Sequence, residues 1–200
     1  MKIAIIKYNA GNVQSVLYAL QRLGVNAVVT DNPEEILKAD KVIFPGVGNA
    51  ASAMDYLQKN NLDKLIISLQ QPVLGICLGL QLLCQASEEG NTKCLGIFDA
   101  SVKKFDNSLQ TENPYKIPHM GWNNIYDLRS PLFTGVKENA FVYFVHSYYA
   151  EFSPQTIAAT DYIIPFSAAI QKDNFYGVQF HSEKSAEAGI QIISNFLKLV

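Results

Sequence analysis

Long apolar runs, cysteine and net charge are all scarce in this sequence, and each shortage excludes a class of protein. No stretch approaches the roughly 18 consecutive apolar residues of a membrane-spanning helix, so we expect no membrane insertion. The 16 basic and 18 acidic residues give a net charge of −2, which supplies no electrostatic reason to expect nucleic acid or an anionic membrane as a partner. The apolar start at Met1–Ile6 is too short for the core of a signal peptide and indicates a first strand instead.

Cysteine is limited to Cys77, Cys84 and Cys94. An odd number without metal-like spacing argues against a disulfide framework and a metal site, and is typical of a reduced, cytoplasmic protein. The glycine-bearing segments lack the spacing of a P-loop or a dinucleotide fingerprint, so we expect no cofactor. We interpret Cys84 and Cys94 as structural residues.

The surroundings of Cys77 set it apart from the other two cysteines. The segment Gly75–Gly79 follows the apolar run Pro72–Leu74 and precedes the apolar Leu80–Leu83, which predicts a strand, a tight turn and a helix. With serine at its centre this would be the G-x-S-x-G nucleophile elbow. A cysteine there lies at a helix N-terminus, where the helix dipole favours the thiolate. On its own the segment is equally compatible with a buried thiol that only packs.

The apolar periodicity predicts an α/β fold. In the first half, strands at 2–7, 26–30 and 41–44 alternate with helices, which implies parallel pairing with right-handed crossovers. The second half is richer in predicted strands, and no linker or repeat divides the chain, so we expect one domain over residues 1–200. The other predicted elements are helices at 12–23, from 32, at 50–60, 62–70 and 186–199, strands at 95–105, 141–145, 156–160, 166–171 and 175–180, and a loop at 106–118.

A thiol nucleophile needs a base, and the base needs a group that orients it. His181 follows the apolar strand Tyr176–Phe180, much as Cys77 ends its own strand. In open α/β sheets, reactive groups gather at the carboxyl ends of the strands, so we expect Cys77 and His181 to meet there. Glu183 can accept a hydrogen bond from the imidazole and fix its tautomer. A His-x-Glu pair can also simply cap the final helix, and this alternative stays open.

Three segments together resemble the class I, triad-type glutamine amidotransferases, namely Pro45–Gly48, Gly75–Gln81 and Gly177–Glu183. The resemblance implies a flavodoxin-like open sheet, mostly parallel, with helices on both faces and a nucleophile elbow. It also implies an amidase that hydrolyses the side-chain amide of glutamine and passes ammonia to a synthase. Two departures are Ser182, where the family usually has proline, and Leu80, where methionine is common.

The same resemblance assigns roles to individual residues. Cys77 is expected to attack the glutamine amide, His181 to transfer the protons and Glu183 to orient His181. The backbone N–H groups of Val47 and Leu78 are expected to form the oxyanion hole.

The glycines Gly46 and Gly48, on either side of Val47, would let its peptide rotate at little steric cost. We expect this rotation only when the synthase is loaded with its own substrate. Glutamine recognition is expected from Gln81 and from the backbone at Ser147 and Tyr148, although Gln81 alone could be an exposed helix residue.

Within this family, the segments 7–16, Pro118–Asn123 and 143–149 resemble the glutaminase subunits of imidazole glycerol phosphate synthases, enzymes of histidine biosynthesis. The resemblance implies a heterodimer with a cyclase subunit of (β/α)8 type, which uses the ammonia to form imidazole glycerol phosphate and AICAR. His146 is either a hydrogen-bonded residue at a sheet edge or has a partner or gating role. Trp122, if it is not at the interface, is buried. The residues expected to face the partner are Asn12, His119, Trp122 and Tyr143.

Two alternatives remain at this stage. One is a paralogous glutaminase that supplies ammonia to a sugar amidotransferase of surface-polysaccharide synthesis. The other is a non-catalytic module that keeps the fold for binding, although such a module would be expected to lack part of the triad. Other triad glutaminases, such as the small subunit of anthranilate synthase, fit the Pro118–Asn123 and 143–149 segments less well.

Overall fold

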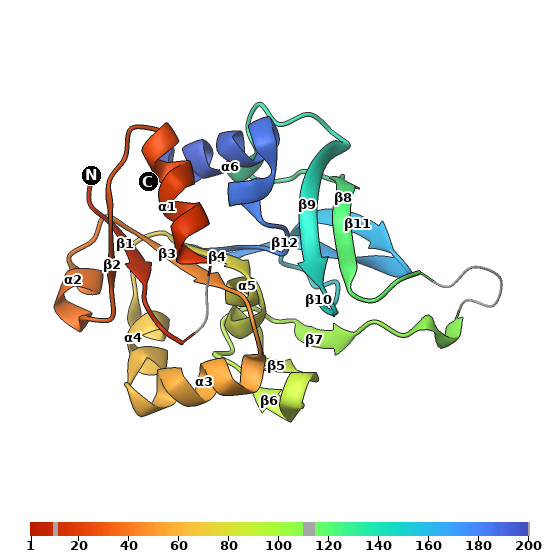
Figure 1. Cartoon of the computed structure of the whole chain (residues 1–200), viewed down its shortest axis with the longest axis horizontal. Coiled ribbons are helices and arrows are strands. Elements are labelled where there is room, and N and C mark those ends of the chain that lie inside the picture. Colours follow the sequence, from red (N-terminus) through yellow and green to blue (C-terminus); the bar gives the residue numbers. More distant parts are fainter. Residues whose placement is uncertain (10–11, 110–114, 200) are drawn as a thin grey trace.

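A seven-stranded sheet forms the centre of the molecule (Figure 1), in a computed structural model that describes residues 1–9, 12–109 and 115–199. The strand order is β11-β12-β13-β4-β3-β1-β2. Neighbours from β2 to β13 run parallel, and β12 and β11 are added antiparallel. The strands are β1 Ile3–Ile6, β2 Ala27–Thr30, β3 Lys41–Gly46, β4 Val73–Cys77, β11 Thr156–Tyr162, β12 Ile164–Lys172 and β13 Phe175–Val178.

Helices cover both faces of this sheet, as the family resemblance implied. Helices α1 (Val13–Arg22) and α6 (Ala186–Lys198) lie on one face, and α3 (Ala50–Lys59), α4 (Leu62–Ser68) and α5 (Leu78–Leu83) lie on the other (Figure 1).

Strand β1 shows why both faces must be covered. Its residues are all buried, and they alternate between the two cores: Ile3 and Ile5 pack with α1 and α6, whereas Ala4 and Ile6 pack with α3 and α5. A strand that is apolar on both sides cannot leave either face in water. The short helix α2 (Pro33–Leu37) begins with proline, and the Asn32 side chain accepts a hydrogen bond from the Glu34 N–H at 2.9 Å.

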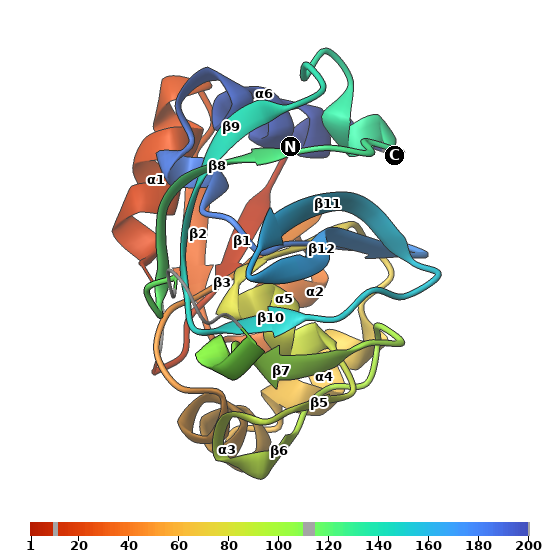
Figure 2. The same cartoon turned by 90° about the vertical axis from the view of Figure 1, so that its right-hand side faces the viewer.

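Two smaller sheets complete the second half of the chain. Figure 2 shows them on opposite sides of the β11–β12 hairpin, with β8–β9 above and β10–β7 below. Strand β8 was not predicted, and β9 is longer than predicted. The strands of the two smaller sheets are β5 Ala86–Ser87, β6 Thr92–Lys93, β7 Ser101–Lys104, β8 His119–Ile125, β9 Ala140–His146 and β10 Tyr148–Ala150. The 3-10 turns of the described chain are η1 Glu89–Asn91, η2 Asn107–Leu109, η3 Pro131–Phe133 and η4 Ser182–Lys184.

The predicted strand at 95–105 is wrong over most of its length, because only Ser101–Lys104 pair as a strand. The backbone N–H groups of Leu95, Ile97 and Phe98 instead bond to the carbonyls of Leu82 and Leu83 at the end of α5. The end of a helix leaves carbonyls without intrahelical partners, and this apolar segment satisfies them. The predicted loop at 106–118 includes η2, and its residues 110–114 lie outside the described part of the chain.

Among the described residues, no helix combines the length and the apolar character needed to cross a membrane.

Candidate active site

Cys77 occupies a sharp turn between β4 and α5. Its φ of 54° and ψ of −108° are a conformation that residues other than glycine rarely adopt. Such strain costs about 1–3 kcal/mol and persists only where the surrounding packing imposes it. Gly79 explains part of that packing, because a Cβ there would lie 1.8 Å from the carbonyl oxygen of Phe44. The helix after Cys77 therefore packs directly onto the backbone of β3, and the predicted elbow is present.

Strand register sets the neighbours of Cys77. In the parallel pair β3–β4, Gly46 lies opposite Cys77, and in the pair β13–β4, Val178 lies opposite Ile76. The residues that follow Val178 therefore emerge beside Cys77 at the carboxyl edge of the sheet. This is the physical reason that the predicted meeting of the Gly177–Glu183 segment with Cys77 occurs.

His181 and Glu183 form a buried pair. His181 Nδ1 lies 2.8 Å from Glu183 Oε1, and the two residues are only 1% and 6% exposed. Among the described residues, His181 Nε2 has no hydrogen-bond partner. Burial alone disfavours a charged imidazole, but interactions with Cys77 and Glu183 outweigh it and raise the pKa of His181 above its ordinary value. Because a carboxylate only accepts, Nδ1 carries the proton, and Nε2 is the nitrogen that remains for proton exchange.

The backbone of His181 is fixed on both sides. Its N–H donates to the Tyr143 carbonyl at 2.8 Å, and its carbonyl accepts from the Ser185 hydroxyl at 2.6 Å. Ser182 is buried in η4, and the backbone bonds from Lys184 N–H to the His181 carbonyl and from Ser185 N–H to the Ser182 carbonyl hold the turn that a proline ring would stiffen. Ser185, rather than His181 or Glu183, is the N-cap residue of α6, so the helix-capping alternative for the His-x-Glu pair is wrong.

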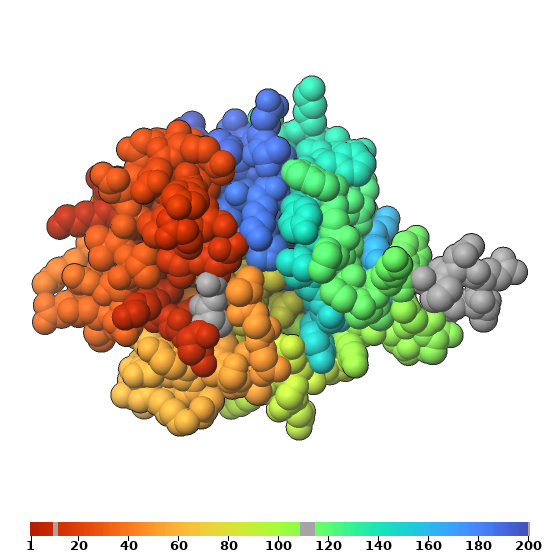
Figure 3. Space-filling view, viewed as in Figure 1, coloured from red at the N-terminus to blue at the C-terminus, as the bar shows by residue number. Residues whose placement is uncertain are grey.

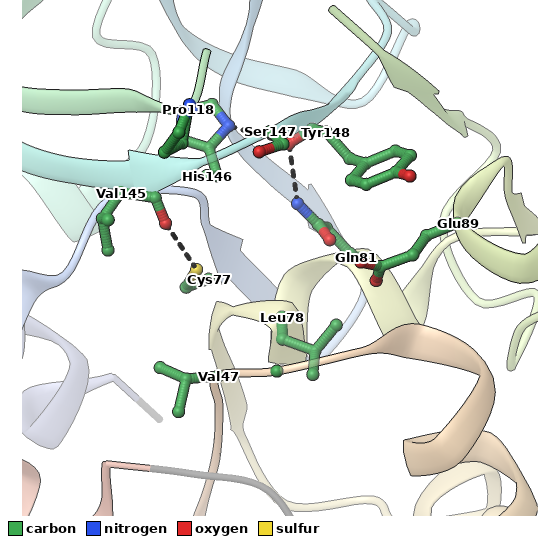
Figure 4. A pocket seen from close by; sticks show the side chains of 11 residues that line it. Val47, Cys77, Leu78, Gln81, Glu89, Pro118, Val145, His146, Ser147 and Tyr148 are labelled. Atoms are coloured by element: carbon green, nitrogen blue, oxygen red, sulfur yellow. Dashed lines mark hydrogen bonds between the residues drawn. The ribbon is translucent and has the colours of Figure 1, made fainter.

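A pocket of about 330 Å³ opens beside the cysteine (Figure 4). Its size suits a small metabolite rather than a macromolecule. Seven of the predicted site residues line it, and four others join them. The predicted ones are Val47, Gly48, Cys77, Leu78, Gln81, Ser147 and Tyr148, and the others are Glu89, Pro118, Val145 and His146.

The side chain of Gln81 is oriented by two acceptors. Its Nε2 donates to the Tyr148 carbonyl at 2.8 Å and to Gln179 Oε1 at 3.0 Å. Both amide hydrogens are engaged, so Oε1 is the atom that remains to accept from a ligand. Gln81 is 4% exposed, which overturns the alternative of an exposed helix residue. Glu89, which also lines the pocket, accepts from the Ala50 N–H at 2.7 Å and was not predicted, since nothing in its local sequence marks it.

The backbone of β3 is tightly packed at Gly46, which lies opposite Cys77. A Cβ at Gly46 would lie 2.3 Å from the Tyr8 hydroxyl oxygen and 2.8 Å from Leu78 Cβ. The Tyr8 hydroxyl donates to the Pro45 carbonyl at 2.7 Å, so the strand is anchored just before the Val47 peptide. Gly48 has a φ of 115°, which residues with a side chain rarely adopt. The oxyanion role of Val47 and Leu78 stays a prediction.

His119 is not a surface residue, which corrects the prediction that its side chain faces a partner. The ring is 3% exposed and stacks on Tyr162, with centroids 3.8 Å apart. His119 Nδ1 lies 3.1 Å from His146 Nε2, and His146 Nδ1 lies 2.7 Å from the Tyr148 carbonyl oxygen. Because that carbonyl only accepts, His146 carries its proton on Nδ1, and His119 donates to His146. His146 is thus a hydrogen-bonded residue that supports the wall of the pocket.

Apolar and aromatic side chains are exposed on the outer face of β8 and β9. Trp122 is 52% exposed and lies opposite Tyr143 in the register, so the alternative that it is buried is wrong. Met120 and Phe141 extend the patch at 62% and 61% exposure. In Figure 3 the blue segment at the start of α6 lies between β8–β9 and α1 on one face of the molecule. Asn12, just before α1, is half-buried and accepts from the Ser15 hydroxyl at 2.9 Å.

Comparisons with known proteins agree with this geometry. The family model described as "Glutamine amidotransferase class-I" matches residues 4–200. The chain is 61% identical over 199 residues to the imidazole glycerol phosphate synthase subunit HisH of Bacteroides fragilis and 56% identical to that of Bacteroides thetaiotaomicron, with all of each chain covered. A glutamine amidotransferase structure from Thermotoga maritima superposes with a TM-score of 0.63 at 17% identity, over 99% of this chain and 83% of that one. The chain belongs to the class I glutamine amidotransferases.

Proposed function

We propose that this chain is the glutaminase subunit of an imidazole glycerol phosphate synthase of histidine biosynthesis. The observation that carries the proposal is the arrangement at the carboxyl edge of the sheet: a strained Cys77 that lines a pocket, and a buried His181–Glu183 pair that interacts with it. The full-length identity of 61% to a synthase subunit supports the choice of reaction.

In the proposed mechanism, Cys77 Sγ attacks the side-chain amide carbon of glutamine, and its proton passes to His181 Nε2. The Glu183 carboxylate stabilises the imidazolium that forms. His181 then protonates the departing nitrogen, the C–N bond breaks, and ammonia leaves a glutamyl thioester on Cys77. Water hydrolyses the thioester to glutamate with His181 again as base. The N–H groups of Val47 and Leu78 stabilise the oxyanion in both steps.

The pocket supplies complementary groups for the amino-acid end of glutamine. Gln81 Oε1 and the Glu89 carboxylate are acceptors suited to the α-ammonium group. The backbone at Ser147 and Tyr148 also lines the pocket, beside Gln81, and its N–H groups can bind the α-carboxylate. We therefore infer that free glutamine, rather than a glutamine side chain within a protein, is the substrate.

The second component is a cyclase subunit of (β/α)8 type, in a heterodimer in the cytoplasm. We assign the interface to the β8–β9 face with Trp122 and Tyr143, together with Asn12, because an exposed tryptophan in an apolar patch is typical of a binding hot spot. The cyclase would receive ammonia and form imidazole glycerol phosphate and AICAR. We also propose that residues 1–200 form a single domain.

A glutaminase assay of the chain alone and with the cyclase tests the function, with Cys77→Ala as the control. We expect glutamate release that rises on addition of the cyclase and its ribonucleotide substrate, and none from the variant. Equal activity in all samples would refute the mechanism. Activation by a sugar amidotransferase instead of the cyclase would favour the paralogue.

A further inference from the structure

Gln179 is a fully buried amide that touches the nucleophile without lining the pocket. It follows Val178, the last residue of β13, and the β13–β4 register places it beside Cys77. Gly46 of β3 lies opposite Cys77 on the other side. Cys77 is therefore flanked by a bare backbone on one side and by a polar side chain on the other.

The contacts of Gln179 fix which end of its amide faces the sulfur. Gln179 Oε1 accepts a hydrogen from Gln81 Nε2 at 3.0 Å, so the NH2 end must point the other way. That end, Nε2, lies 3.8 Å from Cys77 Sγ and is oriented to donate to it. The backbone N–H of Gln179 bonds to the Ala168 carbonyl at 2.8 Å, which anchors the residue to β12.

Apart from the His181 imidazole and the N-terminal end of α5, the groups that contact the sulfur offer little stabilisation to a negative charge. The Val145 carbonyl oxygen lies 3.9 Å from Sγ (Figure 4), where it accepts from a thiol but repels a thiolate. Cys77 is 6% exposed, so water solvates the sulfur poorly. A buried anion without a donor is costly. In the described part of the chain, the Gln179 amide is the neutral donor that contacts Sγ.

We propose that Gln179 is a further catalytic residue, whose side-chain N–H stabilises the Cys77 thiolate and whose carbonyl oxygen holds Gln81. The inference rests on the proposed function only in taking Cys77 as the nucleophile. No additional proton moves: the thiol proton still goes to His181, and the Gln179 amide keeps both of its hydrogens. The same donor favours Cys77 as leaving group when the thioester is hydrolysed. One amide thereby links the reacting sulfur to the residue that binds substrate.

The test is the pH dependence of Cys77 alkylation by iodoacetamide in the free chain, followed by mass spectrometry of the Cys77 peptide. For Gln179→Met, which keeps the side-chain length but removes the donor, we expect the midpoint to rise by about one pH unit, equivalent to tenfold less thiolate. For Gln81→Met, which removes the substrate contact together with the partner of Gln179 Oε1, we expect a raised KM for glutamine. The control is Gln171→Met, the same substitution at a half-buried amide whose contacts are to Ser130 and Tyr176.

A Gln179→Met midpoint identical to the wild-type value would overturn the proposal, and so would an equal shift in Gln171→Met. Gln179→Asn serves where the methionine variant fails to fold, as judged by circular dichroism. It draws the amide back by one methylene, and an unshifted midpoint there would also overturn the proposal. Because alkylation needs neither glutamine nor a cyclase, absence of glutaminase activity in the wild-type chain would refute the proposed function without changing this readout.

Discussion

Acidification from pH 7.5 to 5 should destabilise the fold through the buried histidine pair. Burial lowers the pKa of His119 to about 4, and burial together with His119 lowers that of His146 to about 3, from an ordinary value of 6.5. In the unfolded chain both rings bind protons below pH 6.5, whereas in the folded chain they stay neutral. Stability is therefore complete above pH 6.5 and is lost as the pH falls toward the two folded values.

The size of the effect follows from the unfolded state. At pH 5, protonation of one unfolded histidine with a pKa near 6.5 is worth about 2 kcal/mol, so the pair should cost about 4 kcal/mol. His181 does not contribute below pH 6.5: its raised folded pKa gives stability that is fully present there and is lost as the pH rises from that point through the folded value.

Urea titrations at constant ionic strength between pH 5 and 7.5 measure this loss directly. His119→Phe keeps a ring between Tyr162 and Phe144 and should retain only about half of the pH dependence, about 2 kcal/mol. Tyr162→Phe is the matched control, because it keeps the stacking and both histidines and should keep the full dependence. A wild-type loss under about 1 kcal/mol, or equal slopes for wild type and His119→Phe, would refute the reasoning.

Three further outcomes are expected. Glu183→Gln should lower kcat at least about 100-fold with KM nearly unchanged, since an amide can lock the wrong imidazole tautomer; steady-state glutaminase kinetics with the partner present check this, and an unchanged kcat would contradict it. Gly79→Ala places a Cβ 1.8 Å from the Phe44 carbonyl oxygen and should lower the free energy of unfolding in urea by more than about 3 kcal/mol. Gly24→Ala, with open space around it, should cost only about 1–2 kcal/mol of backbone strain. Equal losses in the two variants would contradict the packing argument. Trp122→Ala should weaken cyclase binding about 30-fold, a hot-spot effect near 2 kcal/mol, without lowering the thermal midpoint, and calorimetry showing an unchanged Kd would remove this face from the interface.

Local sequence patterns predicted a strand or helix well where the spacing of its own apolar residues matches the face that it buries. The periodicities of β1 and α1 identify their boundaries to within a residue or two. The strand at 95–105 was mispredicted because its β-prone residues satisfy the open carbonyls of α5, an interaction that no local pattern contains. The burial of His119 was missed for a similar reason: its stacking partner Tyr162 lies 43 positions further along the chain.

The sequence alone determined the class of protein, the elbow at Cys77 and the His181–Glu183 pair, because glycine placement and two-residue spacing are local properties. Only the tertiary structure decided which side chains meet across strands. Parallel register brings Gly46 and Gln179 to either side of Cys77, and neither neighbour is close to it in the chain. Charge in a buried site depends on such non-local neighbours, so the environment of the sulfur could be seen only in the folded molecule.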